Sequence, residues 1–519
     1  MNRIGQSTVA SLLSFAIFFT SNIVDAGEKL PVATQRNRTF REQLLRDPHR
    51  PGYHFVIPEG IGEPFDVNGA IFWKGRYHLF YLFETREGHC WGHISSTDLC
   101  HWRHHPTALA GDPDGPDHSM FSGCAFLDKN GVPTIAYHGF QAGMCLATST
   151  DDHLDTWTKS PHNPVIPEVV LKDDPHYGIY SVFDPIVWLD EGHYYAALGN
   201  LYYLRSFGDN LKPKDAGDFL FLFKSDDLIH WEYLHRLYQS DRKWTAVDED
   251  NACPEFFKLG EKDVLLFISH TRGCQYYVGT FQDERFFPET HGRMSWIDSD
   301  FFAPESLRDD QGREIMWAWI FDRRNESTIK KSGWSGTFSL PRVLTLGDDN
   351  KLQMWPPKEI EKLRYNPIEQ GPFTIDANSE KKIDQIESNS LEILLEMEPD
   401  NADQFGVQVC ASPDGEEKTL VYYDAIEKKL KIDTTQASLG EGPKSIESGP
   451  LLLKDQEPLE LRIFVDKSVV EVFANKRQAV MRRIYPTRKD SRQVALFSQG
   501  GSTRVPRFRA WEMMPSNPN

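Results

Sequence analysis

The sequence has few positive charges, few cysteines and no long apolar run beyond its N-terminus. Lysine and arginine total 57 against 76 aspartate and glutamate residues, which gives a net charge of −19. This negative charge would repel a polyanion, so it argues against nucleic acid as a partner. No later stretch is apolar for long enough to span a bilayer, and nothing in the composition indicates an oligomeric state.

The seven cysteines are scattered, and no two of them form a Cys-x-x-Cys pair. An odd number is not typical of a disulfide framework, although one or two disulfides could form in an oxidising compartment. His101, His104 and His105 come nearest to a metal-binding pattern, but a surface turn after a strand explains them better. We therefore expect neither a metal nor an organic cofactor.

Residues 1–26 resemble a secretory signal peptide. Arg3 supplies a positive charge, residues 9–20 are mostly apolar, and residues 24–26 (Val-Asp-Ala) resemble a cleavage site. The alternative is a disordered or buried N-terminus. The sequence therefore predicts a secreted or periplasmic protein, in which residues 27–49 lead into the first domain.

Strand patterns dominate residues 52–345. Short runs of aromatic or β-branched residues, such as residues 77–81 and 264–268, are bounded by Gly, Asp and Asn. Hydrophobic residues (39%) and aromatic residues (12%) suffice to build large cores and to line a sugar-sized pocket. These patterns predict an all-β fold.

A weak repeat supports a particular all-β architecture. A Ser-Thr-Asp or Ser-Asp-Asp triplet recurs before a tryptophan, in residues 96–102, 149–157 and 225–231. Each aspartate could close a tight turn between two strands. Repeating sheet units of this size favour a β-propeller, with a pair of β-sandwiches as the alternative.

The predicted domains follow from these patterns. The propeller would occupy residues 50–345, and residues 346–372 would form a linker with a short helical segment. Residues 373–515 alternate again between apolar and polar residues, which predicts a C-terminal β-sandwich of two sheets.

Three acidic positions are candidates for catalysis. Asp66 and Asp184 have apolar or turn residues on both sides, unlike an ordinary surface acid. The third lies in the acidic stretch 248–255, DEDNACPE, which leads directly into two phenylalanines. Glycoside cleavage uses a carboxylate nucleophile and a carboxylic proton donor. For each single aspartate, the alternative is a turn that caps a strand.

Segments spread over residues 50–515 resemble those of glycoside hydrolase family 32, the invertase, fructanase and levanase group, and they occur in the family's order. These segments are residues 64–83, 91–102, 121–125, 182–185, 252–257, 302–304, 319, 339–342 and 461–473. The resemblance implies a five-bladed β-propeller followed by a C-terminal β-sandwich. It also implies an exported, retaining glycosidase that cleaves β-fructofuranosides or a related furanosyl glycoside, so that the partner is a carbohydrate.

The resemblance implies roles for individual residues. Asp66 would be the nucleophile, and Asp184 would stabilise the transition state by holding sugar hydroxyls. The sugar subsite would be lined by four residues, of which the aromatic ones would supply stacking faces: Asn68, Trp91, Phe121 and Ser122.

Four positions depart from the family pattern. Phe65, Leu82 and Phe183 stand where the family has Asn, Gln and Arg, and Ala252 stands where it has the proton-donating Glu. Apolar side chains cannot hydrogen-bond the hydroxyls of a fructosyl group. Two alternatives therefore stay open: a glycosidase with a different sugar specificity, and a non-catalytic carbohydrate-binding protein on a hydrolase scaffold.

The acidic stretch offers replacements for the missing donor. Side-chain alternation along a strand places Asp250 on the same face as Ala252. Glu249 would reach that face only at a bulge or a strand end, and Glu255 is a weaker candidate for the same reason. Two adjacent carboxylates raise the pKa of one of them, as a general acid requires. The sequence therefore predicts Asp250 or Glu249 as the donor.

Overall fold

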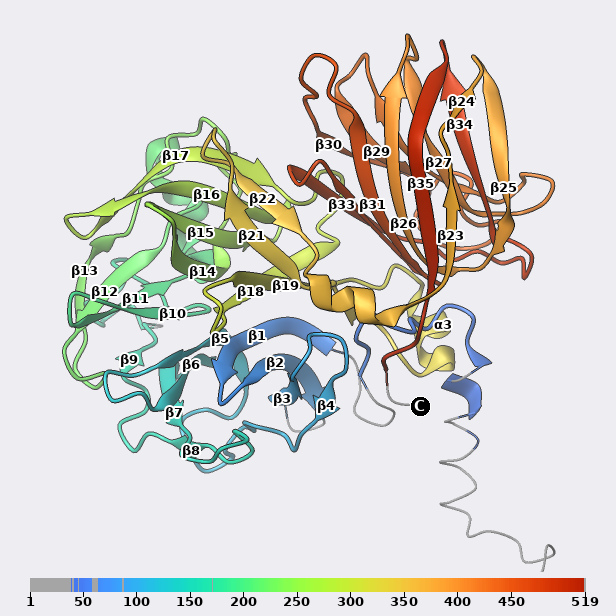
Figure 1. Ribbon diagram of the computed structural model, residues 1–519. Helices are drawn as coiled ribbons and strands as arrows, with labels where there is room; N and C mark the ends of the chain where they lie inside the picture. The colour runs from blue at the N-terminus through green and yellow to red at the C-terminus, as the bar shows by residue number, and fades with distance from the viewer. Residues whose placement is uncertain are drawn as a thin grey trace, which may run out of the picture.

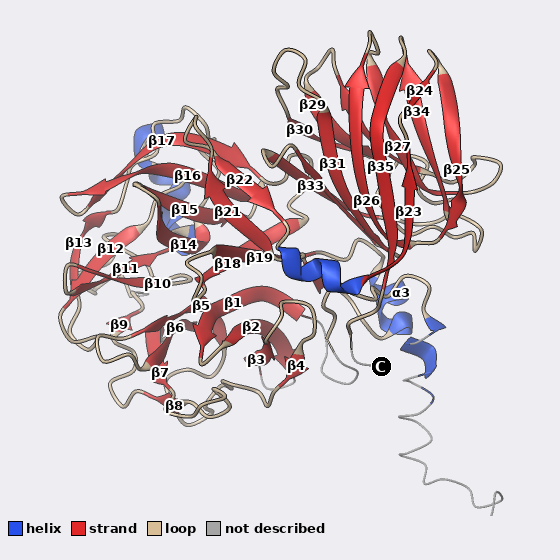
Figure 2. Cartoon of the chain, viewed as in Figure 1, coloured by secondary structure: helices blue, strands red, loops and turns tan. Residues whose placement is uncertain are grey.

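The computed structural model describes residues 39, 42–44, 46–57, 64–85, 88–169 and 171–517 (Figure 1). The predicted signal peptide lies outside the described residues, as do residues 27–38 of the lead-in. Strands dominate the described chain and the helices are short, so the all-β prediction is confirmed (Figure 2). None of the described helices is both long and apolar enough to cross a membrane.

Residues 64–355 form five antiparallel sheets, one after another along the described chain. The first contains β1 (Pro64–Trp73), β2 (Arg76–Thr85), β3 (Gly88–Ser96) and β4 (Arg103–His104). The second contains β5 (Met120–Leu127), β6 (Pro133–Gly139), β7 (Gly143–Thr148), β8 (Thr158–Lys159) and β9 (Ile166–Pro167). The third contains β10 (Ile186–Asp190), β11 (His193–Leu198), β12 (Phe221–Ser225) and β13 (Glu232–Arg236).

The fourth and fifth sheets complete this part of the chain. The fourth contains β14 (Ala252–Leu259), β15 (Lys262–Ser269), β16 (Gly273–Gln282) and β17 (Arg285–Arg293). The fifth contains β18 (Phe301–Arg308), β19 (Glu314–Ile320), β20 (Thr337–Phe338), β21 (Arg342–Leu346) and β22 (Leu352–Trp355). Short helices lie in connections between strands: α2 (Leu201–Phe207), η1 (Gly208–Asn210), η2 (Pro213–Asp215), α3 (Glu326–Ser332) and η3 (Lys358–Leu363).

The first strands of the five sheets surround a common axis. Strand β1 contacts β5 and β18, β10 contacts β5 and β14, and β14 contacts β18, so the contacts close a ring. Figure 1 shows these five strands gathered at the centre of the N-terminal part. Side chains from distant segments therefore meet along one channel.

Four of these inner strands carry an irregularity near their first residues. The register shifts between Pro64 and Val67 in β1 and between Met120 and Gly123 in β5. Corresponding shifts occur early in β14 and β18. A bulge breaks the alternation of side chains and re-aims a residue, which is why bulges recur beside active sites.

The predicted turn repeat is confirmed. The carboxylate of Asp98 accepts hydrogen bonds from the backbone N–H groups of Cys100 (3.1 Å) and His101 (2.9 Å). Asp151 and Asp227 accept equivalent bonds two residues downstream, at 2.7 and 2.9 Å. Each triplet closes the loop that follows the third strand of its sheet.

The C-terminal part consists of two further antiparallel sheets. One contains β23 (Arg364–Gln370), β24 (Phe373–Ile375), β26 (Ser390–Pro399), β31 (Leu459–Asp466), β32 (Val469–Ala474), β33 (Gln478–Arg483) and β35 (Thr503–Met513). The other contains β25 (Ser379–Glu387), β27 (Gln404–Ala411), β28 (Thr419–Asp424), β29 (Lys429–Asp433), β30 (Ile446–Pro450) and β34 (Gln493–Gln499). One apolar core takes residues from both sheets, as in a β-sandwich. Residues 346–372, predicted as a linker, include β22 of the fifth sheet and β23 of the sandwich, so the connection is shorter than predicted.

Buried charges join the two parts. Glu471 on β32 accepts a hydrogen bond from Arg342 on β21 (2.7 Å), and both side chains are at most 1% exposed. His54 lies between Asp466 (3.0 Å) and Glu471 (3.1 Å) and is fully buried. The first contact joins the sandwich to the fifth sheet, and the contacts of His54 join it to the segment that precedes β1.

Candidate active site

A cavity of about 400 Å³ opens at the starting ends of the inner strands. Its wall takes residues from the first, second, fourth and fifth sheets, from the segment just before β10, from α2 and from loops: Phe65, Asp66, Leu82, His89, Phe121, Phe183, Asp184, Leu201, Tyr202, Arg205, Cys253, His270, Ser299, Phe302, Trp319 and Phe321. The predicted acids Asp66 and Asp184 therefore meet in one cavity, although 118 residues separate them in the sequence.

Local backbone geometry aims these acids into the cavity. Asp66 lies within the bulge of β1, and Asp184 lies two residues before β10. Asp184 has a φ of 39° and Cys253, in the bulge of β14, has a φ of 43°, which is uncommon for residues other than glycine. Such backbone strain concentrates at functional sites, where the surrounding structure holds it in place.

One thiol links the two acids. The Sγ of Cys253 lies 3.6 Å from Oδ2 of Asp66 and 3.4 Å from Oδ2 of Asp184. The two carboxylate oxygens therefore cannot lie farther apart than the sum of these distances. Asp184 also accepts the backbone N–H of Cys253 (3.2 Å), and Ser122 donates its hydroxyl to Asp66 (2.6 Å).

The cavity raises the pKa of both acids. Burial raises the pKa of Asp66, although the hydrogen bond from Ser122 opposes the shift. Burial, followed by the negative charge of Asp66, raises the pKa of Asp184 to about 6. The Oδ1 of Asp184 is buried and has no hydrogen-bond partner among the described residues, so it is available to a ligand hydroxyl.

Three of the four departures from the family pattern lie in the cavity wall. Phe65, Leu82 and Phe183 all line it. Phe183 packs against Tyr202 with ring centroids 4.8 Å apart, and Phe65 meets Trp319 edge-on at 5.6 Å. The wall is therefore apolar at the three positions where the family pattern would place polar groups.

The four predicted subsite residues are not all at the surface of the cavity. Phe121 lines the cavity. Ser122 is not in the cavity wall, but it donates a hydrogen bond to Asp66, which is. Trp91 is fully buried and donates its Nε1–H to the carbonyl of Phe121 (2.9 Å), so its ring presents no stacking face here. Asn68 is 1% exposed and outside the cavity wall.

The two predicted proton donors are not in the cavity wall either. Glu249 is buried, and Arg293 binds its carboxylate at 2.8 and 3.1 Å. Gln275 also donates to it (3.0 Å), and the arginine is the main reason that the pKa of Glu249 is lowered despite burial. Asp250 is buried as well, and it accepts hydrogen bonds from the backbone and ring of His270. The alternation argument did not apply because β14 begins only at Ala252 and bulges at once.

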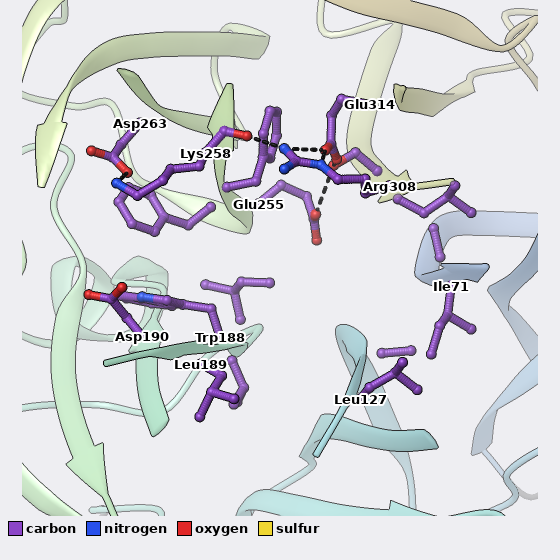
Figure 3. Close-up of a pocket in the computed structure, with 18 of the residues that line it drawn as sticks. Ile71, Leu127, Trp188, Leu189, Asp190, Glu255, Lys258, Asp263, Arg308 and Glu314 are labelled. Carbon is purple, nitrogen blue, oxygen red and sulfur yellow. Dashed lines mark hydrogen bonds and ion pairs between the residues drawn. The ribbon is translucent and has the colours of Figure 1, made fainter. Parts of the chain in front are cut away.

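Glu255 lies at the other end of the channel. The second halves of the inner strands line a separate cavity of about 430 Å³, shown in Figure 3. There the hydroxyl oxygen of Ser306 lies within hydrogen-bond distance of both Glu255 (3.2 Å) and Glu314 (2.9 Å). Burial, followed by the charge of Glu314, raises the pKa of Glu255 to about 8. However, Glu255 lines this cavity, whereas Asp66 lines the other one.

One group among the described residues has the composition of a metal site. The side-chain ligand atoms of His93, His105 and Asp155 lie within 4.8 Å of one another. However, the two imidazole rings are stacked with centroids 4.1 Å apart and planes at 24°, so their lone pairs do not converge. His105 uses its Nδ1 in a hydrogen bond to Asp155 (2.5 Å) instead.

Several cavity residues were not predicted as site residues. Tyr202 and Arg205 come from α2, whose seven residues carry no motif. Trp319 belongs to a family-like segment that gave no indication of its place in the site. His270 directly follows β15. Ala252 pairs with Ile268, and the same antiparallel register extended by two residues places Asp250 opposite His270. Only the strand register could have revealed this pair.

Comparisons with known proteins agree with this architecture. The model of the glycosyl hydrolases family 32 N-terminal domain matches residues 63–356, and that of the family 32 C-terminal domain matches residues 359–512. Sucrose-6-phosphate hydrolase of Zymomonas mobilis is 30% identical over 92% of this chain and 94% of its own.

Solved structures show the same fold at lower identity. Fructan 1-exohydrolase IIa from Cichorium intybus has a TM-score of 0.78 at 22% identity, over 91% of this chain and 98% of that one. Exo-inulinase from Aspergillus awamori has a TM-score of 0.75 at 24% identity, over 91% of this chain and 99% of that one. The family models and the curated relative together show that the chain belongs to glycosyl hydrolase family 32.

Proposed function

We propose that the protein is a retaining glycosidase that cleaves β-fructofuranosides or a related furanosyl glycoside. The observation that carries the proposal is the placement of Asp66 and Asp184 on one cavity floor, both within 3.6 Å of the Cys253 sulfur. In this proposal the five sheets are the five blades of a propeller, and the sugar enters along their common axis.

The two acids have different parts in the reaction. Asp66 is the nucleophile, because the hydroxyl of Ser122 donates a hydrogen bond to its Oδ2 and orients that oxygen. Asp184 holds ring hydroxyls through its unpartnered Oδ1 and stabilises the positive charge that develops at the anomeric carbon. No metal ion or organic cofactor is required for these steps.

The apolar wall favours a substrate other than sucrose as a second candidate. A site built to hydrogen-bond a hydroxyl discriminates by about 10⁴ to 10⁵ against a partner without it. Phe65, Leu82 and Phe183 offer no such bonds, but their faces suit an apolar or less hydroxylated group. We therefore propose that the preferred glycoside carries fewer hydroxyls near these residues than sucrose does.

A substrate panel tests this proposal. Purified wild type and Asp66→Asn are assayed on sucrose, inulin, levan and a set of aryl furanosides. The wild type is expected to release sugar from at least one furanoside, and Asp66→Asn to lose that activity by orders of magnitude. Equal release by both proteins refutes the role of Asp66, whereas tight binding without turnover by the wild type supports a carbohydrate-binding protein instead.

Export is a separate part of the proposal. It depends only on the sequence features of residues 1–26. Mass determination of the N-terminus after expression with a secretory pathway tests it, with cleavage near residue 26 as the expected result. Retention of the intact N-terminus in the cytoplasm contradicts export without affecting the activity assigned to the cavity.

A further inference from the structure

The family position of the proton donor holds Ala252, and the structure shows why no neighbour in the acidic stretch replaces it directly. Ala252 is fully buried in an apolar cluster. Glu249 is held by Arg293, and Glu255 faces the opposite cavity. A furanoside with a poor leaving group needs a proton at its glycosidic oxygen before the bond breaks, so the donor must come from another element of the protein.

We propose that His270 is the proton donor and that Asp250 positions it. This inference rests on the proposed function. The backbone N–H of His270 donates to Oδ1 of Asp250 (2.8 Å), and Nδ1 bonds to Oδ2 of the same carboxylate (2.7 Å). Since Asp250 accepts at Nδ1, that nitrogen carries a proton and the tautomer of the ring is fixed.

The remaining ring nitrogen is placed for proton transfer. His270 lines the cavity with Asp66 and Asp184, and its side chain is 35% exposed. Its Nε2 has no hydrogen-bond partner among the described residues. The ring lies against Phe183 and Phe302, with centroids 6.2 and 5.5 Å away. Two phenylalanines and one carboxylate thus fix the ring at the cavity surface.

The charges that face His270 favour its protonated form. Burial lowers the pKa of His270, but the hydrogen bond to Asp250 and the charges of Asp250, Asp184 and Asp66 outweigh burial and raise it. His89 and Arg205 line the same cavity and are the other basic groups there. These charges therefore favour the imidazolium form, which is the form that a general acid requires.

Other titratable groups of the cavity suit the task less well. Burial raises the pKa of the Cys253 thiol far above its ordinary value, and Tyr202 has a pKa raised to about 12 by burial. The guanidinium of Arg205 does not give up a proton in proteins. Asp184 has a pKa of about 6 and is the competing candidate, so it is included in the test.

The proposed steps balance. A carboxylate oxygen of Asp66 attacks the anomeric carbon while the glycosidic C–O bond breaks, and the leaving oxygen takes the Nε2 proton of His270. The products are the alcohol, a glycosyl ester of Asp66 and neutral His270. In the second step Nε2 removes a proton from water, the water oxygen attacks the anomeric carbon, and the ester bond breaks. This step restores the carboxylate and the imidazolium.

Leaving-group dependence tests the assignment. The test uses full-length wild type, His270→Gln and Asp184→Asn with the methyl and 4-nitrophenyl glycosides of the sugar that the wild type cleaves. For His270→Gln we expect kcat/KM to fall about 10² to 10⁴-fold on the methyl glycoside and less than about tenfold on the 4-nitrophenyl glycoside, which needs little protonation. Retained activity on the second glycoside also shows that the variant is folded.

The pH profile separates proton donation from a purely structural role. The alkaline limb of kcat/KM should report deprotonation of His270 in the wild type and disappear in His270→Gln. Asp250→Asn removes the charge that raises the pKa of His270, so it should move this limb to lower pH. His230→Gln is the matched control, because His230 contacts Asp227 in the same two-point manner (2.8 and 2.8 Å) at an exposed turn. This control variant should have the same kcat/KM as the wild type on both the methyl and the 4-nitrophenyl glycoside.

Three results overturn the proposal. If kcat/KM of His270→Gln falls equally on both glycosides, His270 has only a structural role in the cavity. Leaving-group selectivity in Asp184→Asn, with none in His270→Gln, would make Asp184 the donor. A wild type that cleaves neither glycoside, nor any member of the substrate panel, would refute the proposed function itself. The first two results leave that function intact, so the two failures are distinguishable.

Discussion

Replacing Asp184 with asparagine should stabilise the folded protein while it lowers activity. Burial and the charge of Asp66 raise the pKa of Asp184 from 3.8 to about 6. A pKa raised by one unit corresponds to about 1.4 kcal/mol, so ionised Asp184 costs the folded state about 3 kcal/mol. Because the folded state holds this proton more tightly, the cost develops as pH rises through the interval from 3.8 to 6 and is complete above it.

Asparagine removes the charge and keeps the shape. Its oxygen can accept the N–H of Cys253, and its amide can occupy the place of Oδ1, which has no hydrogen-bond partner among the described residues. We therefore expect Asp184→Asn to raise the free energy of unfolding by up to about 3 kcal/mol at pH 7.5 and by little at pH 4. Urea denaturation of both proteins at the two pH values measures the difference.

A second buried aspartate provides a control of opposite sign. Burial alone would raise the pKa of Asp322, but Arg483 and Arg324 outweigh it and hold the pKa at about 2. Its stabilising contribution is present above the unfolded-state pKa and is lost as pH falls, so Asp322→Asn should destabilise the protein at pH 7.5 by about 2 kcal/mol. If Asp184→Asn is destabilising at pH 7.5, or if its effect is the same at pH 4, the electrostatic account of the cavity is wrong.

Two further predictions concern the cavity wall and the domain junction. The double change Phe65→Asn and Leu82→Gln restores two polar groups, so kcat/KM for sucrose should rise about tenfold relative to an aryl furanoside; an unchanged ratio in the substrate panel contradicts the specificity argument. Glu471→Gln leaves Arg342 buried without its charge partner and should lower the free energy of unfolding by about 3–5 kcal/mol, measured in urea. Glu398→Gln, at the exposed pair with Arg504, should change it by less than about 1 kcal/mol, and a similar loss in both variants would contradict the role of burial.

The sequence allowed the fold to be predicted because its determinants are local. Short apolar runs between turn residues specify strands, and the triplets that contain Asp98, Asp151 and Asp227 recur at the turns where the structure places them. The family-like segments then implied the order of the two parts. The predicted linker was too long, because β22 has only four residues and the seven residues of β23, RYNPIEQ, do not alternate between apolar and polar.

The site was less predictable because bulges and long-range pairing determine it. Asp66 and Asp184 were identified from their apolar neighbours and from the family motifs, and the structure brings them together. Asp250 was predicted by uninterrupted alternation, but β14 begins only at Ala252, so Asp250 precedes the strand. Glu249 was predicted to turn inward at a bulge or a strand end, but its carboxylate binds Arg293 outside the cavity wall. His270 carries no motif, and its pairing with Asp250 follows only from the register of β14 and β15.

The most direct test of the account is the covalent intermediate on Asp66. His270→Gln lacks the group that activates water in the second step. With a 4-nitrophenyl furanoside, the glycosyl ester of Asp66 should therefore form faster than water hydrolyses it. Rapid acid quench, protease digestion and mass spectrometry should then find one glycosyl group on the peptide that contains Asp66. A glycosyl group on another peptide, or turnover with no adduct in either wild type or variant, would contradict a retaining mechanism through Asp66.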